Sequence, residues 1–292
     1  MGKMTMMRMT VKKLPYDKNK PNSLRYTLTL TSAYLLVSHG SRDPQPQIAL
    51  ERLSYLVEEQ LQCYTEKKIN PDKNSDCAVL SPLTMVQIAS LELSEVSLSQ
   101  KIQEFATKLE AVGINTLKVV PLFLLPGFHV KEDIPREIAT AQEKIGHKIN
   151  IECCPYLGSY KGLIKIIARQ FSTHPQDARI IISHGSRRHG GNDSVEAIAC
   201  QLNAKIAYWS IEPSLSDQVH SLVQQGKKHI TIVPYFLFTG GIITVIREQV
   251  HQLQNSLPQT QLNLRQPLGA TPELAKLMVS EWISSGFGVQ RN

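Results

Sequence analysis

The chain contains one short pattern twice, first as Tyr34-Leu-Leu-Val-Ser38-His39-Gly40-Ser41-Arg42 and again as Ile180-Ile-Ile-Ser183-His184-Gly185-Ser186-Arg187. Each copy is an apolar run of strand length that stops at Ser-His-Gly-Ser. Such a run is typical of a buried strand in a parallel sheet, and the His-Gly pair marks a turn at its carboxyl end. Because open α/β sheets bind ligands at the carboxyl ends of their strands, the pattern indicates both a fold class and a place for chemistry.

Further blocks recur in the same order, which indicates an internal duplication. They pair Glu95-Val-Ser-Leu-Ser with Glu212-Pro-Ser-Leu-Ser, Val119-Val-Pro-Leu-Phe-Leu with Ile232-Val-Pro-Tyr-Phe-Leu, and Pro155-Tyr-Leu-Gly with Pro267-Leu-Gly. Two copies are too few for a solenoid, so we predict two similar domains packed together.

Strand-length apolar runs alternate with helical patterns, which predicts an α/β protein whose domains are each a parallel sheet flanked by helices. The expected strands are 33–38, 86–93, 116–123, 149–153, 178–183, 204–209, 229–236 and 261–265. The expected helices are 46–64, 97–112, 130–145, 161–171, 193–202, 214–225, 242–255 and 271–284. We place a basic, disordered extension at 1–30, the first domain at 31–172 with a polar loop at 65–82, and the second domain at 173–292.

Composition narrows the function classes. Residues 1–30 carry seven Lys and Arg against one Asp, so most of the formal charge of +7 lies there and the rest of the chain is close to neutral. A nearly neutral body argues against nucleic-acid binding. No apolar run approaches the roughly 20 residues of a membrane span. The five cysteines form no Cys-x-x-Cys pair, which favours reduced cysteines in a cytoplasmic protein.

Three residues at predicted strand ends are candidates for chemistry. His39 follows the first strand, where Gly40 lets the backbone pass closely. His129 follows a Pro-Gly turn and precedes a helix, whose positive amino end disfavours a positive charge on the imidazole; a metal ligand or proton acceptor must be neutral. Glu92, in Leu91-Glu92-Leu93, alternates away from its neighbours on a strand and points to the same crevice. For each of the three residues taken alone, the alternative to a functional role is a structural role or an exposed side chain in solvent.

The second copy lacks two of these three groups. It has Ile242 where the first copy has His129, and opposite Glu92 it offers Trp209 or Ser210, depending on a one-residue gap. Chemistry that needs two imidazoles and a carboxylate is therefore complete only in the first domain. We expect the second domain to be a degenerate copy that closes the other side of a shared cleft.

Three blocks carry a resemblance to a known family: Leu35-Leu-Val-Ser-His-Gly-Ser-Arg-Asp-Pro44, Leu91-Glu-Leu-Ser-Glu95 and Val120-Pro-Leu-Phe-Leu-Leu-Pro-Gly-Phe-His-Val130. The chain resembles the sirohydrochlorin chelatases of the class II chelatase family, in the long, internally duplicated form, over about residues 33–285. The resemblance implies an enzyme that inserts Co²⁺ or Fe²⁺ into sirohydrochlorin without ATP, in cobalamin or sirohaem biosynthesis. It assigns catalysis to His39, His129 and Glu92, with both histidines as metal ligands. The metal is a substrate, and no permanently bound cofactor is implied.

Sirohydrochlorin carries many carboxylates, so we expect cationic groups in its cleft, where Arg can bind a carboxylate through two hydrogen bonds. Arg42 lies beside the first histidine of the repeated pattern and Arg187 beside the second. The expected substrate-binding residues are Ser41, Arg42, Phe128, His184 and Arg187. Duplication supplies in one chain what a symmetric dimer supplies in two, which favours a monomer.

Three alternative hypotheses stay open. A non-enzymatic tetrapyrrole or metal carrier would bind the ring or the ion without catalysing metallation. A protoporphyrin ferrochelatase shares the chemistry, although the two halves here are alike and short of extra elements. Arg188-His189-Gly190 matches the start of the histidine phosphatase motif but does not follow its strand directly. No phosphate-binding glycine loop occurs, so nucleotide use has no support, and the sequence does not choose between cobalt and iron.

Overall fold

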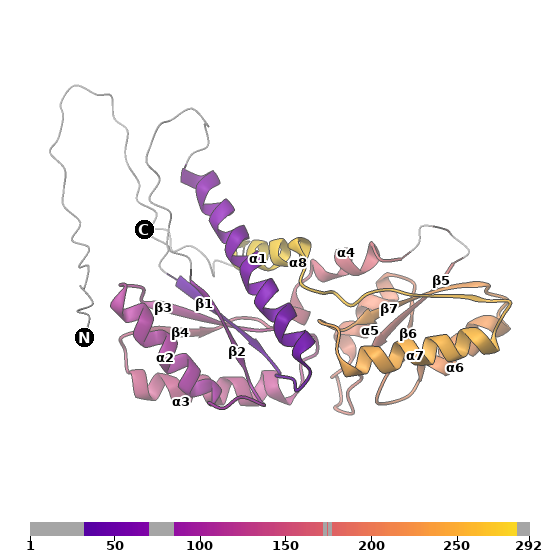
Figure 1. Cartoon of the computed structure of the whole chain (residues 1–292), viewed down its shortest axis with the longest axis horizontal. Helices are drawn as coiled ribbons and strands as arrows, with labels where there is room; N and C mark the ends of the chain where they lie inside the picture. The colour runs from indigo at the N-terminus through magenta and orange to yellow at the C-terminus, as the bar shows by residue number, and fades with distance from the viewer. Residues whose placement is uncertain (1–31, 70–84, 172–173, 175–176, 285–292) are drawn as a thin grey trace, which may run out of the picture.

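The computed structural model describes residues 32–69, 85–171, 174 and 177–284, and these residues form two four-stranded parallel sheets with helices around them (Figure 1). The first sheet has the order β2-β1-β3-β4 and the second the order β6-β5-β7-β8. The strands are β1 (Ser32–Ser38), β2 (Val86–Ser90), β3 (Thr116–Pro121), β4 (Asn150–Cys153), β5 (Ala178–Ser183), β6 (Lys205–Tyr208), β7 (His229–Tyr235) and β8 (Gln261–Leu264). The predicted class, two similar parallel α/β units, is confirmed.

The helices follow the order that the sequence predicts. They are α1 (Pro44–Ile69), α2 (Leu98–Ala111), α3 (Ile134–Ile145), α4 (Leu163–Ala168), α5 (Asp193–Gln201), α6 (Leu215–Gln224), α7 (Gly241–Ser256) and α8 (Pro272–Ser284), with a π-helical turn η1 at His129–Asp133 and a 3₁₀ turn η2 at Leu157–Ser159. The repeated Ser-Leu-Ser block starts α2 and α6. Ser97 and Ser214 each accept the backbone N–H three residues on and complete a capping box.

Some predicted boundaries differ from the structure. Helix α1 continues to Ile69, because the polar residues after position 64 include good helix formers and no proline before Pro71; the rest of the predicted loop 65–82 lies outside the described residues. Strand β2 ends at Ser90 rather than 93, and α4 is shorter than predicted. The extension 1–30 and the predicted division at 172/173 also lie outside the described residues.

Alternate residues of β1 face two different cores. Ala33, Leu35 and Val37 pack into a core that includes buried residues of α2 and α3. Tyr34 and Leu36 face the opposite core, with α1. Both sets are buried, as expected for a central strand of a parallel sheet. The core under α1 is continuous with buried residues of the second half, so the two lobes share one apolar interior.

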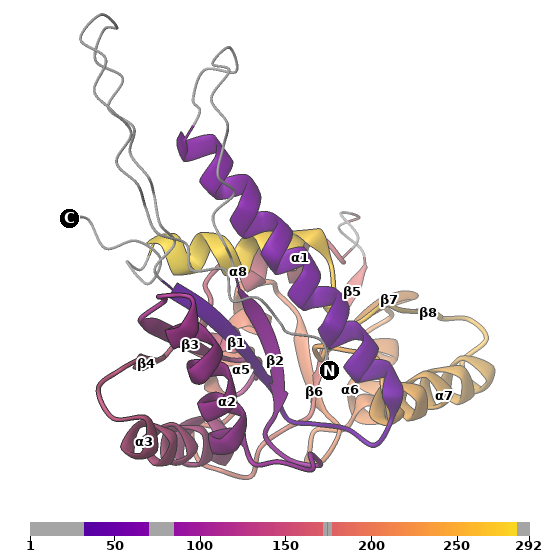
Figure 2. The ribbon, with the colours of Figure 1, turned by 60° about the vertical axis from the view of Figure 1, so that its left-hand side comes forward.

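The last helix lies on the first sheet. Figures 1 and 2 both show α8 beside α1, and the two helices are in contact. Trp282 of α8 is only 1% exposed and lies in the core that also contains Tyr34 of β1. The first lobe is therefore completed by residues from the far end of the chain. None of the helices in the described ranges is long and apolar enough to cross a membrane.

Candidate metal site

The carboxyl ends of β1 and β2 bring Glu92 beside His39. The backbone N–H groups of Leu91 and Glu92 donate to the carbonyl oxygens of Ser38 and His39, each at 2.9 Å. Glu92 thus lies in the bend after β2, and the predicted alternation on a strand is wrong because the strand has already ended. Gly40 has a φ of 99°, and a Cβ there would collide with the carbonyl oxygen of Glu92. This close approach requires glycine.

Three of the predicted residues meet at this edge of the sheet. The Nε2 atom of His39 lies 3.7 Å from one carboxylate oxygen of Glu92, and the Nε2 atom of His129 lies 3.9 Å from the other. The two imidazole rings have centroids 4.9 Å apart and cross at 79°. One ligand atom from each residue lies within 4.8 Å of the other two. Within the described ranges, this is the group of His, Cys, Asp and Glu side chains close enough to hold one ion.

Hydrogen bonds at the far side of each ring fix which nitrogen faces the cluster. The Nδ1 atom of His39 lies 3.3 Å from the carbonyl oxygen of Gly40, and that of His129 lies 2.8 Å from a carboxylate oxygen of Asp133. Both partners are acceptors, so both Nδ1 atoms carry a proton, and in the neutral form of each ring Nε2 presents a lone pair. The hydrogen bond from His129 is the main cause that lowers the pKa of Asp133.

In their neutral forms the two imidazoles, together with the carboxylate, therefore offer three acceptor groups that face one another. Such a set of acceptors suits a divalent transition-metal ion, which takes imidazole and carboxylate ligands. Two ligands of one ion at bond lengths of about 2.1 Å stand roughly 3.0–3.5 Å apart. The observed separations of 3.7 and 3.9 Å are slightly wider, so the three groups would have to move closer together to share one ion. The side chain of Glu92 is half exposed, so solvent reaches its carboxylate.

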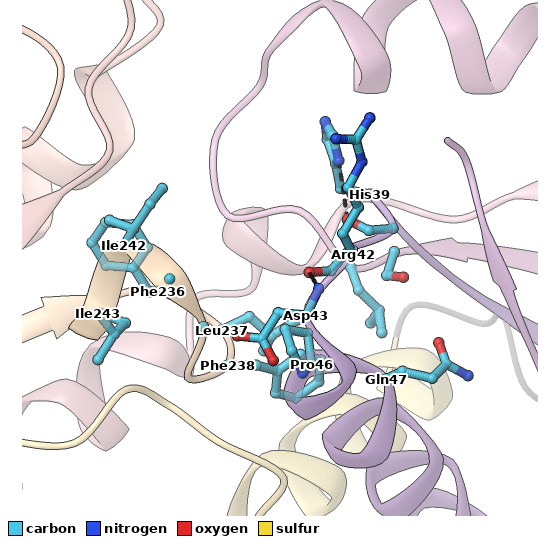
Figure 3. A pocket seen from close by; sticks show the side chains of 16 residues that line it. His39, Arg42, Asp43, Pro46, Gln47, Phe236, Leu237, Phe238, Ile242 and Ile243 are labelled. Carbon is cyan, nitrogen blue, oxygen red and sulfur yellow. Dashed lines mark hydrogen bonds between the residues drawn. The ribbon is translucent and has the colours of Figure 1, made fainter. Parts of the chain in front are cut away.

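A cleft of about 530 Å³ opens beside His39 between the two lobes. Ser41, Arg42 and Gln47 are among the residues that line it from the first lobe. Phe236, Leu237, Phe238, Ile242 and Ile243 line it from the second lobe. Figure 3 shows His39 and Arg42 on one side and Ile242 and Phe236 across from them. The wall from the first lobe thus carries a cation, Arg42, beside an anion, Asp43, and the wall from the second lobe is apolar.

The second lobe has the same backbone arrangement as the site in the first lobe, but it lacks side chains equivalent to Glu92 and His129. The N–H groups of Trp209 and Ser210 donate to Ser183 and His184 at 2.9 Å, as Leu91 and Glu92 do in the first lobe, so Ser210 is the counterpart of Glu92. This settles the one-residue gap that the sequence left open. The carbonyl oxygens of Gly127 and Gly240 each accept an N–H four residues on, which places Ile242 opposite His129.

The predicted substrate-binding residues occupy different places. Ser41 and Arg42 line the cleft, whereas Phe128, His184 and Arg187 are exposed and lie outside the described cleft lining. Next to Arg187, Arg188 approaches Glu132 of the π-helical turn at 3.6 Å and thereby links the two lobes close to His129. Sequence reasoning missed Asp133 as a partner of His129. Their spacing of four residues was the available signal, because such pairs are neighbours on a helix.

A family model named CbiX matches residues 33–174 and 178–284, which is most of the chain. The chain belongs to the CbiX family. A sirohydrochlorin cobaltochelatase of Priestia megaterium is 26% identical over 261 residues, covering 84% of this chain and 76% of the relative. A sirohydrochlorin ferrochelatase of Bacillus subtilis is 24% identical, covering 80% of this chain and 85% of the relative. The family resemblance predicted from the sequence is confirmed.

Solved structures support the same fold. The structure of SirB from Bacillus subtilis with Fe³⁺ has 25% sequence identity and a TM-score of 0.64, and the match covers 87% of this chain and 97% of that one. A second SirB structure, in complex with cobalt, has 23% identity and a TM-score of 0.60, which supports the fold alone. The duplicated architecture of this CbiX chain is therefore shared over nearly the full length of a solved relative.

Proposed function

We propose that this protein is a sirohydrochlorin chelatase, which inserts a divalent metal ion, Co²⁺ or Fe²⁺, into sirohydrochlorin without ATP. The observation that carries the proposal is the meeting of His39, Glu92 and His129 at one edge of the first sheet, where His39 also lines the interlobe cleft. The names of the relatives support the same activity. The product of this reaction belongs to cobalamin or sirohaem biosynthesis.

The three groups divide the work of metal insertion. His39 and His129 bind the ion through Nε2, and imidazole holds Co²⁺ or Fe²⁺ less tightly than a cluster of thiolates would. Two ring N–H protons must leave the macrocycle when the metal enters. Glu92 accepts one of them, and a histidine that has released the metal accepts the other. Both protons then pass to solvent, which reaches the half-exposed carboxylate.

The cleft positions the macrocycle over these groups. The apolar wall of Phe236 and Ile242 suits a flat conjugated ring, and Arg42 on the opposite wall suits its carboxylates. His184, Arg187 and Phe128 stay proposed substrate-binding residues outside the cleft lining, since all three are exposed at strand-end turns or beside His129. The acidic side chain of Asp43 also lines the cleft, so the carboxylates of the ring must lie toward Arg42.

An absorbance assay tests this function. Sirohydrochlorin is mixed with Co²⁺ or Fe²⁺, with and without protein, and the spectral change on metallation gives the rate. We expect the wild-type protein to accelerate insertion, and His39→Ala, His129→Ala and Glu92→Gln each to lower the rate by about 100-fold or more. Glu95→Gln is the matched control, since Glu95 is an exposed carboxylate three positions further on and outside the cluster.

The same assay separates the enzyme from a carrier. A non-enzymatic tetrapyrrole or metal carrier would bind the ring or the ion and leave the rate at that of the protein-free mixture. Near-normal rates in both histidine variants would also reject the assignment. The relatives include both a cobaltochelatase and a ferrochelatase, so the ratio of the Co²⁺ and Fe²⁺ rates decides which metal this chain prefers.

We further propose that the protein acts as a monomer in the cytoplasm, without nucleic acid or membrane. Two facts support this. Both walls of the cleft come from one chain, and the cysteines in the described ranges, Cys63, Cys153, Cys154 and Cys200, are free thiols, as expected in a reducing compartment. Light scattering at micromolar concentration tests the monomer.

A further inference from the structure

The two lobes differ by one residue at the start of the helix that carries His129. Gly127 and Ile134 are seven positions apart, whereas the matching Gly240 and Ile246 are six apart. Both isoleucines are fully buried; Ile134 is the first buried residue of α3, and in α7 Ile246 follows the buried Ile243. The later buried positions keep equal spacing, namely Ile134, Ile138 and Ala141 in α3 and Ile246, Val250 and Leu253 in α7. The first lobe therefore holds a single extra residue, confined to the segment between the glycine and the buried isoleucine.

The extra residue is accommodated as the π-helical turn. The backbone N–H of Ile134 donates to the carbonyl oxygen of His129, five residues back, while α7 begins as a regular α-helix. Single π-helical turns inside helices occur often at functional sites. The insertion leaves the buried face of the helix in register. The insertion changes the position only of the residues before Ile134, and these lie beside the proposed metal ligands.

The turn gives His129 a partner that the second lobe lacks. Asp133 closes the turn and accepts a 2.8 Å hydrogen bond from the Nδ1–H group of His129. Its other oxygen accepts a hydrogen bond from Arg136. In α7 the position of Asp133 corresponds to Val245 or Ile246, depending on which side of the insertion is aligned. Neither can accept a proton, so the imidazole and its carboxylate partner are absent together from the second lobe.

We propose that the one-residue insertion exists to hold Asp133 against His129, and that Asp133 is a positioning residue for the metal site. By accepting the hydrogen bond from Nδ1–H, Asp133 keeps the lone pair of Nε2 directed at Glu92 and fixes the plane of the ring. The proposal rests on the proposed function only in taking His129 as a metal ligand. It assigns Asp133 no contact with the metal or with the macrocycle.

Binding of Co²⁺ alone tests this role without the tetrapyrrole. The visible absorption of Co²⁺ reports its affinity and its ligand geometry as the ion is titrated into the full-length protein. We expect Asp133→Ala to weaken binding by about 10- to 100-fold and to alter the spectrum. Asp133→Asn keeps an oxygen that accepts the Nδ1 proton, so it should restore affinity to within about threefold of wild type. Arg136→Gln is the control for loss of the ion pair alone and should bind Co²⁺ normally.

Deletion of Lys131 tests the insertion itself. Lys131 is exposed, and its removal gives the first lobe the six-residue spacing of the second. We expect thermal unfolding within a few degrees of wild type and a Co²⁺ affinity as low as that of His129→Ala. Should the deletion variant fold poorly, Asp133→Ala decides. If Asp133→Ala has the Co²⁺ affinity and spectrum of the wild-type protein, the proposal is overturned. If the wild-type protein binds Co²⁺ through His129 but does not metallate sirohydrochlorin, only the proposed function is overturned.

Discussion

The indole of Trp282 stacks on the phenol ring of Tyr34, with ring centroids 4.4 Å apart and planes 13° apart. The indole N–H also donates a 2.8 Å hydrogen bond to the hydroxyl of Tyr160. Tyr34 lies in the first strand and Trp282 in the last helix. The contact therefore joins the two ends of the described chain over the sheet that carries His39, and the stability of the site depends on α8.

We expect Trp282→Ala to lower the free energy of unfolding by about 3–5 kcal/mol, because it empties a fully buried aromatic site. Trp282→Phe retains a ring that can stack and leaves the Tyr160 hydroxyl without its donor, at a cost of about 1–3 kcal/mol. Urea unfolding followed by circular dichroism measures both. Trp209→Phe, at a partly exposed position of the second lobe, is the control and should cost less than about 0.5 kcal/mol. Equal midpoints for Trp282→Ala and Trp209→Phe would contradict a role of α8 in the first lobe.

The position of α8 could not be predicted from its sequence. Its apolar spacing indicates that the helix has a buried face, but spacing does not tell which sheet the face covers. The repeated strand and turn, by contrast, predicted both parallel sheets, because apolar runs joined by helical segments have few alternative arrangements. The strand order and the shared core under α1 depend on long-range packing and needed the structure.

We expect Co²⁺ affinity to respond differently when the strand-end histidine of each lobe is removed. His184 has Ser210 and Ile242 in the places that Glu92 and His129 occupy beside His39. We therefore expect His184→Ala to leave Co²⁺ affinity unchanged and His39→Ala to lower it by at least tenfold. Titration of Co²⁺ into both variants measures the difference. As a proposed substrate-binding residue, His184 should affect the KM for sirohydrochlorin instead. A parallel loss of Co²⁺ affinity in the two variants would mean that the second lobe also holds metal.

Arg42 should act on binding of the macrocycle rather than on the metal. It lines the cleft next to His39, where a charge-assisted hydrogen bond to a carboxylate is worth about 1.5–3 kcal/mol. We expect Arg42→Met to raise the KM for sirohydrochlorin by about tenfold or more and to change kcat little. The effect should shrink at high salt, since exposed charges are screened. Arg52→Met is the matched control, because Arg52 is an exposed arginine of α1 outside the cleft lining. Equal KM values for the two variants would remove Arg42 from the binding surface.

The sequence predicted which three side chains meet at the site, but not which residues hold them in place. His39 and His129 stand out because each follows an apolar strand at a glycine-containing turn, and parallel strands end at one edge. Glu92 was placed correctly at that edge by an argument about alternation that the bend after β2 makes wrong. Asp133 was missed although its spacing of four residues from His129 was a signal, because the π-helical turn that brings the two side chains together has no apolar period of its own.

Gly40 provides the sharpest test of how Glu92 is held. Gly40 and Gly113 both have left-handed backbone conformations, with φ of 99° and 79°, so alanine at either position costs about 1–2 kcal/mol of stability. A Cβ at Gly113 meets no atom within 4 Å, whereas one at Gly40 collides with the backbone of Glu92. We expect Gly113→Ala to bind Co²⁺ normally and Gly40→Ala to lose at least tenfold in affinity, because the bend that carries the carboxylate must move away from His39. Thermal unfolding and Co²⁺ titration of the two variants separate backbone strain from displacement of the ligand. Equal affinities would show that the contact between the ends of β1 and β2 does not set the position of Glu92.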